Sequence, residues 1–274
     1  MNKIFQRNVK KCINILRFRK LSIGLQIYSD IHLEFYKSAL KMKKYSDYLV
    51  LAGDIGKIGC KNYDYFLEYV STMWKHVIYV PGNHEYYNDI YNINELKNMY
   101  KDLIKKYDNI HYLDDSYWDH NGYRFIGSTL WSNPSCITDL CDFNKIKDLS
   151  LDTFKKLHIT SIEYIKKILN ETNTLTPILI THFPPIRDNT CHPKYNGSKY
   201  TSYFTNELIE LDIPTKDLSK ISMWISGHTH CSYDIKIDNC RFVSNQLGYP
   251  GEYKEANAFT DEKSVYLLNH LDKN

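Results

Sequence analysis

The sequence predicts a layered α/β fold, and two observations lead to that prediction. In the first half of the chain, short apolar runs rich in β-branched residues alternate with longer segments in which apolar side chains recur at helical spacing. In the last quarter, the apolar runs follow one another with only short turns between them. Helices between the early strands and strands in succession later indicate a layered α/β sandwich, and not a plain doubly wound sheet.

The first half contributes strands and helices in alternation. Strands are expected at the apolar runs 21–29, 47–52, 77–80, 110–113 and 123–130. Helices are expected at residues 62–75 and 93–107, because their apolar side chains fall on one face. The pair Asn121-Gly122, which precedes the last of these strands, predicts a tight turn.

The second half contains two segments that are expected to be irregular, residues 131–150 and 183–200. Loops as long as the second one are usually functional or disordered inside a compact domain. Helices are expected at residues 151–169, beginning near Ser150 or Asp152, and at residues 202–211. Strands are expected at residues 178–181, 221–226, 233–237, 240–244 and 263–269.

The composition is that of an ordinary globular protein and excludes several functional classes. Of the 274 residues, 43% are hydrophobic and 24% are charged, and the net charge of +3 is too small to argue for a nucleic-acid or membrane partner. No apolar run approaches the roughly 18–20 residues that a membrane-spanning helix needs. The seven cysteines are odd in number and form no C-x-x-C pair. This pattern predicts free thiols in a reducing compartment, and hence a cytoplasmic location.

We expect a basic N-terminal extension at residues 1–20 and one domain at residues 21–274. The extension carries seven Lys and Arg residues and no acidic residue, with apolar side chains between them. Because charges interrupt every apolar stretch, a secretory signal is not expected. A basic amphipathic targeting segment and a frayed or packed extension both stay open. Nothing in the sequence indicates an oligomeric state.

Polar side chains with ligand or acid–base chemistry follow five of the expected strands, at the point where each strand ends. In the clearest case, the run 76–80 is stopped by Pro81-Gly82, after which Asn83 and His84 follow. The whole set is Asp30, His32, Asp54, Asn83, His84, His182, His228 and His230. Because the carboxyl ends of neighbouring strands meet at one edge of an open α/β sheet, we expect these side chains to form one site.

The residue types in this set suit a pair of divalent transition-metal ions. Apart from His84, they comprise four imidazoles, two carboxylates and one amide, which favours Mn, Fe, Zn or a similar ion over Ca or a lone Mg. Seven ligands are too many for one tetrahedral ion, so we expect two ions that share a bridging carboxylate.

Two ions about 3.5–4 Å apart would stabilise both the attacking and the departing oxygen of a phosphoryl displacement. They would also lower the pKa of a water between them, which would give a metal-bound hydroxide nucleophile near neutral pH. His84 is not needed as a ligand, and it could protonate the leaving group as a general acid.

The order D-x-H, G-D, G-N-H-E, H and G-H-T-H between residues 30 and 230 resembles the calcineurin-like metallophosphoesterase superfamily. The resemblance implies a four-layer α/β/β/α sandwich around a two-metal centre. It implies that the first ion is held by Asp30, His32, Asp54 and His230. It implies that the second ion is held by Asp54, Asn83, His182 and His228. Asp54 would thus be the bridge and His84 the proton donor, and Gly53, Gly82 and Gly227 would allow the tight turns that aim the ligands.

The sequence departs from two patterns found within the family. Protein phosphatases of the family continue their second motif as G-D-x-V-D-R-G, whereas residues 53–59 read G-D-I-G-K-I-G. This argues against a protein phosphatase of that type and leaves open which group orients His84, for which Glu85 is one candidate. Residues 244–252 resemble the N-P-R-G-Y-x-G-E stretch of small bacterial-type members, but Gln246 and Leu247 replace its Pro and Arg. A phosphate contact from that stretch is therefore in doubt.

Three functions are compatible with these observations. The first is a metal-dependent hydrolase of a small phosphomonoester or phosphodiester, which the complete set of ligands and acid supports. The second is a nuclease on the same centre, because double-strand-break nucleases share these motifs and because residues 3–20 and 37–44 are basic. Against a nuclease, no aromatic-plus-basic module for binding nucleic acid is recognisable in the sequence. The third is a binding scaffold that has lost catalysis, although no ligand is missing here. The metals and the ester are left open.

Other residues have weaker interpretations. Around the centre, phosphate could be contacted by Arg187, His192, Lys194 and Lys199, although an ordinary solvated loop explains them equally well. Surface or helix-cap positions are expected for His76, His111, His120, His158 and His270.

Overall fold

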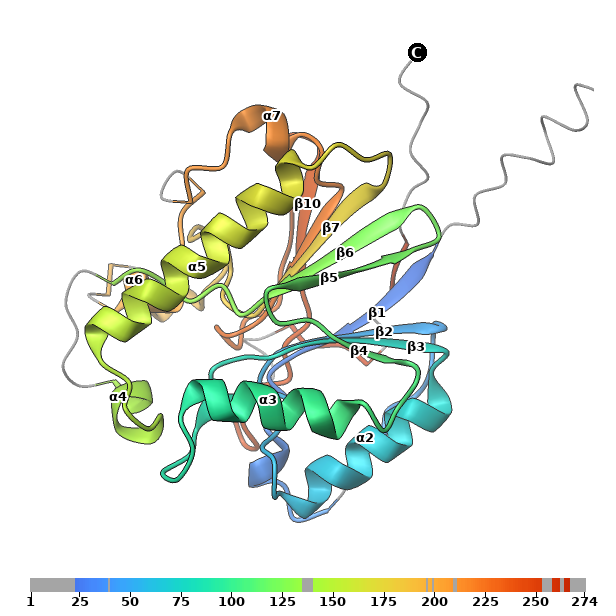
Figure 1. Ribbon diagram of the computed structural model, residues 1–274, viewed down its shortest axis with the longest axis vertical. Coiled ribbons are helices and arrows are strands. Elements are labelled where there is room, and N and C mark those ends of the chain that lie inside the picture. The colour runs from blue at the N-terminus through green and yellow to red at the C-terminus, as the bar shows by residue number, and fades with distance from the viewer. Residues whose placement is uncertain are drawn as a thin grey trace, which may run out of the picture.

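Two β-sheets lie face to face in the computed structural model, and helices cover both outer faces (Figure 1). The structure describes residues 23–38, 40–134, 140–195, 197–198, 200–208, 211–252, 258–261 and 264–266. This arrangement confirms the predicted four-layer α/β/β/α sandwich. The expected extension at residues 1–20 lies outside the described residues.

The first sheet has the strand order β11-β1-β2-β3-β4 in the described part of the chain. Its strands are β1 (Gly24–Tyr28), β2 (Tyr48–Ala52), β3 (His76–Val80), β4 (Ile110–Tyr112) and β11 (Ser264–Tyr266). β1 to β4 run parallel, and β11 pairs antiparallel with β1. The carboxyl ends of β1, β2 and β3 therefore lie next to one another.

The second sheet has the order β5-β6-β7-β8-β10-β9. Its strands are β5 (Ser116–His120), β6 (Tyr123–Ser128), β7 (Thr176–Thr181), β8 (Met223–Ser226), β9 (Asp234–Ile237) and β10 (Cys240–Ser244). The four inner strands are parallel, and the edge strands β5 and β9 are antiparallel to their neighbours. The carboxyl ends of β7 and β8 are thus adjacent as well.

The described helices and 3₁₀ turns connect these strands. The helices are α2 (Lys61–Met73), α3 (Ile93–Ile104), α4 (Cys141–Lys145), α5 (Leu151–Asn170), α6 (Thr201–Phe204) and α7 (Thr215–Leu218). The 3₁₀ turns are η1 (Leu33–Phe35), η2 (His84–Tyr86) and η3 (Pro193–Tyr195). Ser150 caps α5 by accepting a hydrogen bond from the Thr153 N–H, so the first of the two predicted caps is the right one. Among the described residues, no helix combines the length and the apolar character that crossing a membrane requires.

The alternation of side chains along the strands builds the layers. In β2, Val50 packs between the two sheets, whereas Leu49 and Leu51 pack toward α2 and α3. On the far side of the second sheet, Leu179 packs against Ile165 of α5. The inner strands are largely apolar on both faces because both faces are covered, which is why they could be recognised as continuous apolar runs.

The structure corrects several expectations about individual elements. β5 was not expected, because its sequence S-Y-W-D-H contains no apolar run; as an edge strand it exposes every second side chain. The expected irregular segment 131–150 is interrupted by α4. The expected helix at residues 202–211 is wrong beyond Phe204, because Thr205 is extended and the buried Asn206 side chain bonds to the Leu130 and Pro184 carbonyls instead. The expected strand at 263–269 is described only at β11.

The histidines outside the motifs also differ from expectation. His158 is buried on α5 and bonds to the Trp131 carbonyl, so its assignment to the surface is wrong. His76, His111 and His120 are only partly buried, but they pack around Trp118, whose ring lies 3.7 Å from that of His111. His270 lies outside the described residues.

Candidate metal centre

The eight side chains that the sequence singles out all lie at the carboxyl ends of strands. Asp30 and His32 follow β1, Asp54 follows β2, and Asn83 and His84 follow β3. From the second sheet, His182 follows β7 directly, and His228 and His230 follow β8. Seven of the eight are buried, and the His230 side chain is 12% exposed.

The backbone at these strand ends is unusual. Five of the eight residues have a positive φ, namely Asp30 (54°), His32 (52°), Asp54 (55°), His228 (77°) and His230 (52°). A positive φ is uncommon for residues other than glycine and costs free energy. Its concentration here turns the chain sharply after β1, β2 and β8, which brings these five side chains into the site.

Neither Gly53 nor Gly82 has room for a Cβ atom, and Gly53 has a positive φ as well. Gly53 has a φ of +87°, as expected for a tight turn. Gly82 does not have a positive φ; a Cβ atom on it would fall on the Asp54 carboxylate and its backbone N–H. The prediction that Gly82 serves a turn is therefore incomplete, because this glycine is needed for space.

A first group of ligand atoms comes from Asp30, His32 and His230. The Nε2 atoms of His32 and His230 are 3.0 Å apart, and His230 Nε2 lies 3.5 Å from Asp30 Oδ1. Backbone N–H of His228 donates to the Asp30 carboxylate and fixes its orientation. Three ligand atoms of the kinds that transition metals prefer thus converge on one point.

A second group comes from Asp54, His182 and His228, with Asn83 beside them. His182 Nε2 lies 3.0 Å from Asn83 Oδ1, 3.2 Å from His228 Nδ1 and 3.4 Å from Asp54 Oδ2. The other ring nitrogen of His228, Nε2, has no hydrogen-bond partner within the described ranges. A compact set of two nitrogen and two oxygen atoms is therefore formed by His182 Nε2, His228 Nδ1, Asn83 Oδ1 and Asp54 Oδ2.

One oxygen of Asp54 faces both groups. Oδ1 accepts the backbone N–H of His84 at 2.8 Å, which leaves Oδ2 free to face the cluster. Oδ2 lies 3.8 Å from His32 Nε2 in the first group and 3.4 Å from His182 Nε2 in the second. This is the position that a bridging carboxylate would take, so the donor set fits a pair of cations.

Hydrogen bonds behind the ligands set which nitrogen of each ring is available. His182 Nδ1 lies 3.0 Å from the Ala52 carbonyl, which can only accept, so this nitrogen carries the hydrogen and Nε2 is left to bind. His230 Nδ1 lies 2.6 Å from Glu252 Oε2, with the same consequence. Asn83 donates through Nδ2 to the buried Asp142 at 2.9 Å, which turns its Oδ1 toward His182.

The charges around Asp54 shift the pKa values of the cluster. Burial alone would raise the pKa of Asp54, but the positive charges of His182 and His84 hold it well below its usual range. Burial alone would lower the pKa of His182, but the Asp54 carboxylate raises it to about 9. Without metal, a proton on His182 therefore compensates the buried carboxylate, and a cation would take over that role.

His84 is oriented by Glu34 and not by Glu85, so the candidate that the sequence offered is wrong. His84 Nδ1 lies 2.9 Å from Glu34 Oε1, and Glu34 comes from η1. Burial would lower the pKa of His84, but the charges of Asp54 and Glu34 outweigh it and raise that pKa. Glu85 instead accepts backbone N–H groups of Asp54, Ile55 and Gly82 and the Tyr79 hydroxyl. It holds the loops together and does not contact the His84 ring.

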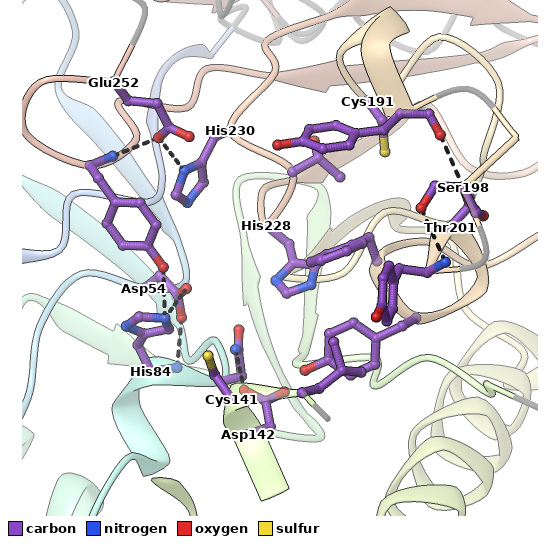
Figure 2. A pocket seen from close by; sticks show the side chains of 18 of the residues that line it. Asp54, His84, Cys141, Asp142, Cys191, Ser198, Thr201, His228, His230 and Glu252 are labelled. Carbon is purple, nitrogen blue, oxygen red and sulfur yellow. Dashed lines mark hydrogen bonds and ion pairs between the residues drawn. The ribbon is translucent and has the colours of Figure 1, made fainter. Parts of the chain in front are cut away.

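A cavity of about 660 Å³ opens over the centre. Figure 2 shows His84 and His230 on one side of this cavity and Ser198 and Thr201 on the other. Asp142 and Glu252 also line it. The phosphate contacts considered from the sequence are not among the described lining residues: Arg187 forms an ion pair with Glu207, and Lys199 lies outside the described residues.

Further side chains that contact this centre, and that the sequence did not single out, are Glu34, Asp142, Tyr249 and Glu252. The Tyr249 hydroxyl lies 3.2 Å from His84 Nε2, and its ring lies 4.4 Å from that of His32. Tyr249 and Glu252 belong to the Gly-Tyr-x-Gly-Glu part of residues 244–252, so the motif was the available signal. Glu34 lies in η1 and Asp142 in α4, and neither carried such a signal.

Comparisons with known proteins show the family and the fold of the chain. The chain is 31% identical over 266 residues to uncharacterized protein L509 of Acanthamoeba polyphaga mimivirus, an alignment that covers 86% of this chain and 94% of that protein. The crystal structure of the phosphopantetheinyl hydrolase PptH from Mycobacterium tuberculosis superimposes with a TM-score of 0.65 at 16% identity, covering 85% of this chain and 92% of PptH, which is a likeness of fold. The sequence profile of the calcineurin-like phosphoesterases matches residues 27–232, and the chain belongs to that family.

Proposed function

We propose that this protein hydrolyses a small phosphoester at a centre of two divalent transition-metal ions. The observation that carries the proposal is the position of Asp54 Oδ2 between two groups of ligand atoms. Membership of the calcineurin-like phosphoesterase family supports the same chemistry. Mn, Fe and Zn all suit such a ligand set.

The ligand assignment that we propose follows the two groups of atoms. One ion would be held by Asp30, His32, Asp54 and His230. The other would be held by Asp54, Asn83, His182 and His228. Bound there, the ions would supply the positive charge that activates water and stabilises the oxygens of a phosphoryl group.

His84 would supply the proton for the departing oxygen. Its Nδ1 faces the Glu34 carboxylate, which keeps that nitrogen protonated, so Nε2 is the atom that gives up a proton. Nε2 lies 3.9 Å from Asp54 Oδ2, and His84 lines the cavity, so the proton would be delivered beside the centre. The backbone N–H of His84 bonds to Asp54 and ties the acid to the bridging ligand.

Less evidence supports the two alternative functions, a nuclease and a binding scaffold without catalysis. The basic segment at residues 37–44 does not line the cavity, and residues 3–20 lie outside the described part, so no observation favours a nuclease. A scaffold without catalysis would not need His84, yet its ring is held in place by Glu34.

We also propose that residues 21–274 form one domain in a reducing, cytoplasmic environment. β11, near the end of the chain, pairs with β1 in the first sheet, which supports a single domain. Among the described residues, free thiols are found at Cys60, Cys141, Cys191, Cys231 and Cys240, which supports the reducing environment.

Metal content and turnover of bis(p-nitrophenyl) phosphate, measured on the same preparation, test the proposed hydrolase. We expect two ions per chain and turnover that disappears when the metal is removed with a chelator and returns when it is restored. The monoester p-nitrophenyl phosphate, measured in parallel, decides between monoester and diester preference. Two bound ions without hydrolysis of either ester would contradict the proposal and favour the scaffold.

A further inference from the structure

The cavity over the metal centre has an outer wall that differs in chemistry from the centre itself. Across from His84 and His230, this wall is formed by described residues between 191 and 204. It contributes rings and hydroxyl groups to the cavity from Tyr195, Ser198, Tyr200, Thr201, Tyr203 and Phe204. Figure 2 shows Ser198 and Thr201 on this side, across from His84.

Aromatic rings also reach the metal ligands directly. The Phe204 ring lies 5.5 Å from that of His228, and the Tyr87 ring stacks on that of His84 at 4.1 Å. A group attached to a phosphate at the centre would therefore meet an aromatic ring without any spacer, both beside the second metal group and beside the proton donor.

Positive side chains are missing from the cavity lining in the described ranges, the histidines of the centre aside. Lys57 and Lys194 lie over the rings of Tyr87 and Tyr195 without lining the cavity. Besides Asp54 of the centre, two carboxylates line the cavity. Oδ1 of Asp142 accepts from Asn83 and Tyr87, whereas its Oδ2 has no hydrogen-bond partner among the described residues, and Glu252 contacts His230.

From this wall we infer that the substrate is a phosphoester whose organic part carries no negative charge and is aromatic or apolar. A second phosphate or a carboxylate on that part would lose its water against rings and hydroxyls, and the described lining residues outside the centre offer no positive charge to replace it. The aromatic wall favours flat or apolar groups through their buried area. The inference depends on the proposed function only in that the phosphate group of the substrate is taken to bind at the metal centre.

Binding of arylphosphonates to the manganese-loaded protein, followed by calorimetry, tests this inference without requiring turnover. The compounds are 4-carbamoylphenylphosphonate and 4-carboxyphenylphosphonate, which have nearly the same shape and differ in charge, and methylphosphonate, which lacks the ring. We expect the carbamoyl compound to bind at least about tenfold more tightly than either of the others. Equal or tighter binding of the carboxyl compound would overturn the inference.

Substitutions at Cys141 provide the matched variants, because this residue is exposed and lines the cavity. Cys141→Lys introduces a cation and should reduce the preference for the carbamoyl compound severalfold or reverse it, whereas Cys141→Ser should leave it unchanged. Phe204→Leu should weaken the binding of the carbamoyl compound more than the binding of methylphosphonate. An equal effect on both compounds would contradict a contact between the Phe204 ring and the organic part. If no phosphonate binds in a metal-dependent way, the proposed centre itself fails; metal-dependent binding without charge discrimination defeats only the inference about the substrate.

Discussion

The two walls of the cavity are built in different ways. The inner wall consists of buried side chains at the ends of core strands, aimed by strained backbone and by hydrogen bonds such as that from His182 to the Ala52 carbonyl. The outer wall comes from described residues between 191 and 204, whose regular structure consists of the 3₁₀ turn η3 and the short helix α6. The inner wall can therefore hold fixed geometry for chemistry, whereas the outer wall can vary its side chains without disturbing the sheets. The proposed reaction and the inferred choice of substrate thus depend on different parts of the fold.

The largest expected effect comes from breaking the inner wall at the shared ligand. Asp54→Asn should weaken the binding of both ions and lower kcat/KM by at least about a thousandfold, because the removed charge faces both groups of ligand atoms. Asp30→Asn should weaken the binding of only one ion, the one that Asp30 would share with His230. Metal content measured by atomic absorption distinguishes the two variants, and Asp89→Asn, at an exposed position, serves as the control. Equal metal loss in the Asp54 and Asp30 variants would contradict the bridging role.

A somewhat smaller effect is expected at the proton donor. His84→Ala should keep its metal content and lose about a hundredfold to ten-thousandfold in kcat on an ester with a poor leaving group such as phenol. The loss should be much smaller with p-nitrophenol, which departs without needing a proton. Measuring both leaving groups separates proton donation from a structural effect, since misfolding would reduce both rates equally. His192→Ala, the same change outside the cavity lining, is the matched control.

Glu34→Gln should have an intermediate effect that shows in the pH profile. Glu34 helps to raise the pKa of His84 through its charge and its hydrogen bond. Because His84 acts in its protonated form, activity falls as the pH rises through that pKa. Removing the charge of Glu34 lowers the pKa, so this fall should move to lower pH and kcat should drop about tenfold to a hundredfold. A lower kcat with an unshifted alkaline limb would argue for a purely structural role.

Uptake of metal should be accompanied by release of protons. In the metal-free centre the pKa of His182 is raised to about 9, so the ring is protonated at neutral pH and must lose that proton to become a ligand. Metal affinity should therefore increase as the pH rises toward 9. Calorimetric titration with Mn²⁺ in buffers of different ionisation enthalpy measures the number of protons released, and a value of zero at pH 7 would contradict this picture.

The same division explains how much could be predicted from the sequence. The ligands were recognisable because each stands directly after an apolar run, and neighbouring parallel strands bring their ends together regardless of the loops between them. The hydrogen-bond partner of His84 was not recognisable from the sequence, because Glu34 is 50 residues away along the chain whereas Glu85 is adjacent. Adjacency was misleading: the Glu85 side chain points back to the backbone N–H groups of Asp54 and Ile55. Contacts between loops depend on the folded chain and leave no periodic signal.

The outer wall was harder still to predict. The loop at residues 183–200 was expected to be functional because of its length, and its basic residues drew attention to phosphate. The structure instead pairs Arg187 with Glu207 and turns Tyr195, Tyr200 and Phe204 toward the cavity. The sequence could indicate that the loop mattered, but not which of its side chains would face inward.

The smallest expected effect is at Tyr249, where the two walls meet. Its hydroxyl lies 3.2 Å from His84 Nε2, the atom that we propose donates the proton, and its ring packs on His32. A departing oxygen must come to the same nitrogen, so the hydroxyl has to move aside when substrate binds. Tyr249→Phe keeps the ring and removes one neutral hydrogen bond, worth about 0.5–1.5 kcal/mol, so KM should fall by up to about tenfold while kcat changes little. A large loss of kcat with an unchanged KM would instead mean that the Tyr249 hydroxyl takes part in delivering the proton, and the boundary between reaction and substrate choice would then run through this residue.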